Sequence, residues 1–135
     1  MPSFNDPVVD AHELREAVRG LAHATRSIED PTSIYSVLGS ISSALASLSQ
    51  SLHQLGDFHD GPSPKQAWMN GDPNAQRAAS YKVSWELHRA AEMVHQVAEC
   101  VDRAHEVEAT IAYNIPDYPS LAPVPRPMQD RGLSL

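Results

Sequence analysis

The segment from Pro31 to Gly56 contains no Asp, Glu, Lys or Arg. Large apolar residues recur in it at alternating spacings of four and three, at Ile34, Leu38, Ile41, Leu45, Leu48, Leu52 and Leu55. This spacing predicts a helix with a heptad seam. A helix that faces water on one side normally carries charge there. We therefore expect this uncharged helix to be covered on more than one side.

Three Asp-Pro pairs mark predicted helix starts, because Asp caps a helix and Pro is favoured at its first position. They are Asp6-Pro7, Asp30-Pro31 and Asp72-Pro73, and they predict helices at about 7–28, 31–58 and 73–113. The third helix has its own predicted seam, formed by Val83, Leu87, Ala90, Val94, Val97, Val101, Ala104 and Ile111. We therefore expect an all-α fold, an antiparallel three-helix bundle with a long third helix, in one domain over residues 1–113.

The last segment, residues 114–135, contains five prolines. Proline interrupts helices and central strands, since it lacks a backbone N–H and restricts the residue before it. The sequence predicts a Pro-rich extended or disordered C-terminal tail.

Composition excludes several classes of function. The net charge is −7, and no segment is strongly basic, so we expect no nucleic-acid binding. The chain has no apolar run of membrane-spanning length and no signal-like N-terminus, which predicts a cytoplasmic protein without a membrane partner. Arg outnumbers Lys eight to two, a bias typical of GC-rich bacterial genomes. No catalytic or phosphate-binding motif occurs, so we expect neither an enzyme nor a cofactor.

Helix lengths favour self-association. The third predicted helix is roughly 60 Å long and the second roughly 40 Å, at 1.5 Å per residue. Either the third helix bends or breaks, or a second chain, most simply in a homodimer, covers the excess. Small residues on the second helix permit close approach, and the predicted oligomer interface consists of Ser36, Gly39, Ser40, Ser43, Ala46 and Ser47. The alternative is that the chain's own tail or loop packs on this surface.

Tyr81, Trp85 and His88 follow one another at helical spacing and form a second candidate surface. Tyr and Trp are typical contact anchors, so these residues predict a patch for a protein partner. Alternatively, the loop containing Trp68 folds back over them. The first functional hypothesis is a non-enzymatic interaction or scaffold module that self-associates and binds another protein through its third helix or tail.

The second hypothesis is a metal-binding bundle that uses His and carboxylate residues of the third helix. Glu92-x-x-His95 and Asp102-x-x-His105 have the spacing found in di-iron carboxylate bundles. One row of that helix contains His88, Glu92, His95 and Glu99, and the end of the second helix contains His53, Asp57 and His59. We interpret the row as a solvated charged face and assign no metal ligand.

A minor alternative comes from two short motifs. Trp68-Met69-Asn70-Gly71 lies between the second and third predicted helices, and Tyr113 precedes Asp117 by four residues. Their order resembles the WXG100 class of small helical proteins, which carry W-x-G between two long helices and whose partners carry Y-x-x-x-D/E after the second. The first motif has one extra residue here, and Pro116 interrupts the second. The resemblance would imply a helical protein exported by type VII secretion.

Overall fold

The computed structural model describes residues 1–61 and 70–114 and contains three helices. They are α1 (Pro7–Ala24), α2 (Ser33–Asp60) and α3 (Pro73–Glu108). The predicted all-α fold with a long third helix is confirmed, and the described ranges contain no strand. None of the described helices is long and apolar enough to cross a membrane. Trp68 and the predicted Pro-rich tail from residue 115 onward lie outside the described residues.

Two of the three predicted caps are present. The Asp6 carboxylate accepts hydrogen bonds from the backbone N–H groups of Val8 and Val9 and starts α1. Asp72 accepts from Asn74 and Ala75 in the same way and starts α3. Each aspartate satisfies backbone donors that have no partner within the helix.

The third Asp-Pro pair acts differently. The Asp30 carboxylate accepts from the backbone N–H and the hydroxyl of Thr32, at 3.0 and 2.6 Å. These two bonds lower the pKa of Asp30, the Thr32 hydroxyl contributing most. The Ser33 N–H bonds to the Asp30 carbonyl and closes a turn over residues 30–33, so α2 begins at Ser33, two residues later than predicted.

Helices α1 and α3 both end earlier than predicted, and each ends in local hydrogen bonds. After α1, the Thr25 hydroxyl donates to the carbonyl of Leu21, and the Arg26 N–H bonds to the carbonyl of His23, three residues back. After α3, the Thr110 and Ile111 N–H groups likewise bond three residues back. Tighter turns of this kind commonly close helix ends.

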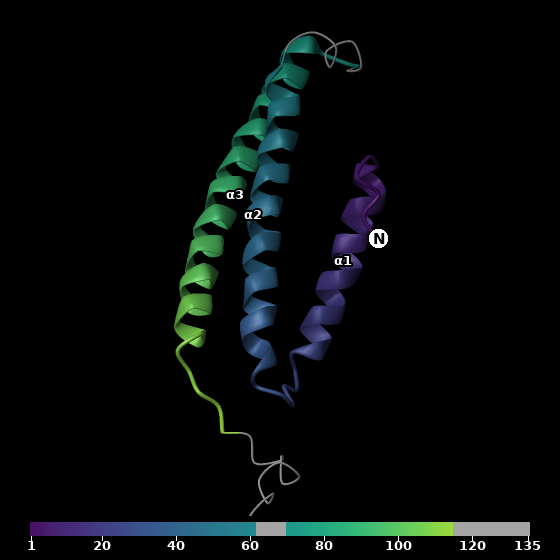
Figure 1. Ribbon diagram of the computed structural model, residues 1–135. Coiled ribbons are helices and arrows are strands. Elements are labelled where there is room, and N and C mark those ends of the chain that lie inside the picture. The colour runs from purple at the N-terminus through teal and green to yellow at the C-terminus, as the bar shows by residue number, and fades with distance from the viewer. Residues whose placement is uncertain (62–69, 115–135) are drawn as a thin grey trace, which may run out of the picture.

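Helices α2 and α3 run antiparallel and pack along their length, whereas α1 stands apart beside them (Figure 1). Among the described helices, close packing joins only α2 to α3. Leu14 and Val18 of α1 are correspondingly exposed. The packed unit of the structure is therefore a two-helix hairpin.

The hairpin is held along a line of small residues, which we call the small-residue seam. It comprises Ser42, Ser49 and Gly56 of α2 with Ser84, Ala91 and Ala98 of α3. Within each helix these residues recur every seventh position, so they stay on one side of the helix. The Ser49 hydroxyl donates to the Ala91 carbonyl at 2.8 Å, a bond that requires the two backbones to approach closely.

The large apolar residues flank this seam. In each helix, the residues one and four positions before a seam residue lie on one side of the seam. Because the two helices are antiparallel, these residues of both helices share the same side of the hairpin. This surface, the apolar face, consists of Ile34, Leu38, Ile41, Leu45, Leu48, Leu52, Leu55, Val83, Leu87, Ala90, Val94, Val97 and Val101. Most of its α2 members are half-buried, while Leu55, Val83 and Val97 are exposed. The predicted heptad rows thus border the contact between the helices.

The N-terminal lead is attached to α1 through Asp10, and acid should release it. The Asp10 carboxylate accepts from the backbone N–H of Ser3 at 2.7 Å and of Phe4 at 3.3 Å. The Ser3 bond is the largest cause of a lowered Asp10 pKa. Since folding lowers this pKa, the stabilisation is present above the unfolded value, about 3.9, and is lost as the pH falls through the folded value. An NMR titration should give Asp10 a lower midpoint in the folded chain than in urea, and equal midpoints would contradict the contact.

Candidate functional site

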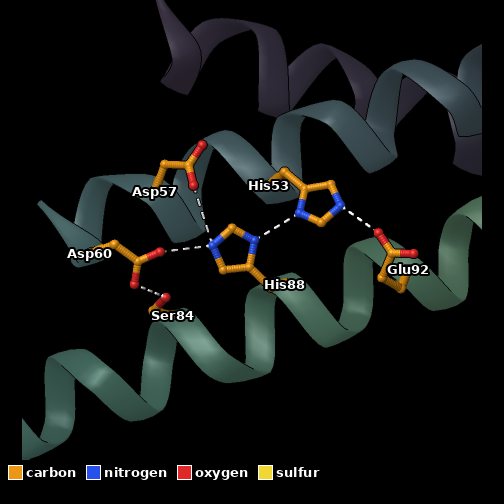
Figure 2. A network of polar contacts seen from close by, with 6 residues as sticks. All are labelled: His53, Asp57, Asp60, Ser84, His88 and Glu92. Atoms are coloured by element: carbon orange, nitrogen blue, oxygen red, sulfur yellow. Dashed lines mark hydrogen bonds and ion pairs between the residues drawn. The ribbon is translucent and has the colours of Figure 1, made fainter.

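A chain of polar contacts joins α2 to α3 (Figure 2). Its charged and imidazole residues lie one or four positions after seam residues, which places them on the side opposite the apolar face. We call it the histidine network, and it consists of His53, Asp57, Asp60, Ser84, His88 and Glu92. The first three residues come from the last third of α2 and the last three from the middle of α3. The two antiparallel helices therefore bring together side chains that are about 30 residues apart in sequence.

His53 and His88 meet at the centre of the network. The Nδ1 atoms of the two rings are 2.7 Å apart, and the ring centroids are 5.0 Å apart. The Nε2 atom of His53 lies 2.8 Å from a carboxylate oxygen of Glu92. His53 therefore bridges Glu92 and His88.

The other ring nitrogen of His88 faces two carboxylates. Its Nε2 atom lies 3.3 Å from Oδ1 of Asp57 and 3.0 Å from Oδ2 of Asp60. The second oxygen of Asp60 accepts a short hydrogen bond from the Ser84 hydroxyl. Among the described residues, Asp57, Asp60 and His88 are close enough to one another to hold a metal ion.

Gly56 makes room for this arrangement. A Cβ atom at position 56 would lie only 2.8 Å from Nε2 of His88, and Gly56 itself is buried. Any other residue would require the imidazole to move away from the α2 backbone. The placement of the His88 ring therefore depends on the small-residue seam.

Each ring directs one nitrogen at a carboxylate. Nε2 of His88 faces Asp57 and Asp60, and Nε2 of His53 faces Glu92. An N–H group at either nitrogen would donate to a carboxylate oxygen. The remaining nitrogen of each ring, Nδ1, faces the other ring.

The structure divides the histidines that the sequence grouped together. His59 does not join His53 and Asp57 in the histidine network, since its Nδ1 lies 3.0 Å from the Ser80 hydroxyl. In the predicted α3 row, His88 and Glu92 contact α2, whereas His95 pairs with Glu99 at 3.4 Å on the surface. The row is therefore only partly a solvated face. The sequence reasoning missed Asp60, whose nearest signal is its i, i+3 spacing from Asp57.

The residues of the predicted oligomer interface occupy two environments. Ser36, Ser40, Ser43 and Ser47 line an open groove together with His105. Gly39 lies at the inner edge of that groove, where an added Cβ atom would be 3.1 Å from the His105 ring. Ala46 belongs to a neighbouring groove that also contains His53 and Glu92. The row of small residues thus follows the polar side of the hairpin.

The predicted partner patch is also divided. Tyr81 and Trp85 are exposed at 72% and 53%, and the Arg89 guanidinium lies 5.4 Å from the Trp85 ring. His88 faces α2 within the histidine network. Among the three patch residues, the aromatic pair alone remains on the outer surface.

Comparisons with known proteins identified no relative of this chain. No protein-family model matches the chain, and neither the curated proteins nor the solved structures contain a match. The functional argument therefore rests on the residues of this chain.

Proposed function

We propose that this protein is a non-enzymatic interaction module that works as a homodimer, in which the apolar faces of two hairpins pack together. The observation that carries this proposal is the missing core. Among the described residues, the buried apolar side chains are Ala91 and Ala98, and no large side chain is fully buried. Leu, Ile and Val residues instead form one continuous strip of the surface, as is typical of an interaction site.

The dimensions of the apolar face suit a second copy of the hairpin. Helix α2 has 28 residues, which gives a strip of roughly 42 Å, and two helices side by side are roughly 20 Å wide. The product, roughly 800 Å², equals the area that each partner buries in a stable protein interface. Two such hairpins face to face would form a four-helix bundle.

Helix α1 of the same chain is too short to replace that partner. Its 18 residues span roughly 27 Å, whereas the 36 residues of α3 span roughly 54 Å. If α1 closed onto its own hairpin, about 15 Å of the roughly 42 Å strip, or about a third of its length, would remain exposed. A partner hairpin covers the full length.

Light scattering on a sizing column over a range of concentrations tests the proposal. The expected mass is twice the 14.8 kDa of one chain. A mass of one chain at micromolar concentration, together with cooperative melting, would show that α1 closes the apolar face within the chain. That result would contradict the dimer.

Ser43→Arg distinguishes the two candidate surfaces. Ser43 lies in the groove on the polar side, where a long charged residue would block a second helix. If the apolar faces form the dimer, this variant keeps the mass of two chains. Dissociation of the variant would instead place the interface at the serine row.

A further inference from the structure

We propose that Asp57, Asp60 and His88 bind one divalent cation of the Zn²⁺ type. The site lies at the end of the hairpin, with two ligands from the last turn of α2 and one from α3 (Figure 2). It is separate from the apolar face, so it is independent of the proposed dimer.

The distances between the ligand atoms suit such an ion. Zn²⁺ binds nitrogen and oxygen ligands at about 2.0–2.2 Å, which puts neighbouring ligand atoms of a tetrahedral site roughly 3.3 Å apart. Nε2 of His88 lies 3.3 Å from Asp57 Oδ1 and 3.0 Å from Asp60 Oδ2. All three ligand atoms lie within 4.8 Å of one another. Small side-chain rotations would complete the coordination, with water as the remaining ligand.

His53 and Glu92 support His88 from behind. A metal-bound histidine characteristically donates its other ring N–H to a neighbouring acceptor, which fixes the orientation of the ring. Here Nδ1 of His88 lies 2.7 Å from Nδ1 of His53, and Nε2 of His53 lies 2.8 Å from Glu92. With the cation on Nε2 of His88, the Nδ1–H group of His88 would donate to Nδ1 of His53, and the Nε2–H group of His53 would donate to Glu92.

Charge favours the same conclusion. Asp57 and Asp60 stand in the last turn of α2, where the helix dipole is negative and carboxylates are unfavourable. Glu92 adds a third carboxylate nearby. A divalent ion would offset this concentration of negative charge. The Asp57, Asp60 and His88 side chains are 70%, 50% and 30% exposed, so the ion can enter from water.

The donor set selects the type of ion. An imidazole nitrogen favours Zn²⁺ and similar transition metals, whereas Mg²⁺ prefers a shell made of oxygen atoms. We therefore expect Zn²⁺ to bind in the presence of a large excess of Mg²⁺. Displacement by Mg²⁺ would identify the three residues as an ordinary acidic surface and would overturn the proposal.

Calorimetric titration of the full, untagged chain with Zn²⁺ after chelator treatment is the test. We expect one ion per chain. His88→Gln should weaken binding by more than the roughly 10–100-fold cost of changing an outer-shell partner. The matched control is His95→Gln, which removes an exposed histidine of the same helix. Equal weakening by both substitutions, or no binding to the parent chain, would overturn the proposal.

A second variant covers the case in which His88→Gln disturbs folding. Asp57→Asn with Asp60→Asn preserves the shape of both side chains but removes the anionic ligands. Its helix content should match that of the parent by circular dichroism, while Zn²⁺ binding should fall at least 100-fold. Binding as tight as in the parent would overturn the proposal.

Discussion

Val97→Asp is expected to separate the proposed dimer into single chains. Val97 is 50% exposed in the hairpin, so a carboxylate there would still reach water in an isolated chain. In the proposed dimer the same position is covered by the partner, and two-fold symmetry buries two unpaired carboxylates. Since an unpaired buried charge costs several kcal/mol, the dissociation constant should rise at least about 100-fold. Sedimentation equilibrium measures the change directly.

Gln96→Asp is the matched control for this substitution. It introduces the same charge one position earlier, on the outer side of α3 away from the apolar face. It should leave the dissociation constant within about threefold of the parent. If both substitutions weaken the dimer equally, net charge rather than the apolar face controls association.

Ala91→Leu is expected to destabilise the hairpin. Ala91 is fully buried in the small-residue seam, and its carbonyl accepts the hydrogen bond from Ser49. Three extra carbon atoms do not fit between backbones this close, so α2 and α3 must move apart. Overpacking of this kind costs roughly 1–3 kcal/mol, and the broken hydrogen bond adds about 1 kcal/mol. The midpoint of urea denaturation should fall accordingly.

Ala90→Leu makes the same chemical change at the neighbouring position. Ala90 belongs to the apolar face, where a larger side chain has space and extends an existing row of apolar residues. Its denaturation midpoint should stay near that of the parent or rise. Equal losses from the two substitutions would mean that the close contact does not lie along Ala91.

The presence and approximate starts of the three helices could be predicted from the sequence because the capping signals are local. Asp6-Pro7 and Asp72-Pro73 cap the helices that they precede. Asp30-Pro31 has the same form, yet the Thr32 hydroxyl competes for the carboxylate and delays the helix. A dipeptide does not reveal such competition, which depends on the residue that follows.

The contact face and the histidine network were harder to predict. Apolar periodicity identified the rows of Leu45 and Val97 but did not show that the small residues beside them form the contact. Hydrophobicity gives the direction of burial, whereas close packing depends on side-chain size. His53 meets His88 only through the register of two antiparallel helices, and the length of the connection did not determine that register.

The small-residue seam has a consequence for alignment of the two helices. Large side chains fix the register of neighbouring helices because they interdigitate. Ala, Ser and Gly are too small to interdigitate in this way. A shift of α3 by seven residues would again place small residues opposite small residues. Directional bonds, such as Ser49 to the Ala91 carbonyl and Ser42 to Asp102, would be lost in that shift. The register of the hairpin therefore depends on a few polar bonds and on the fit of the His88 ring beside Gly56.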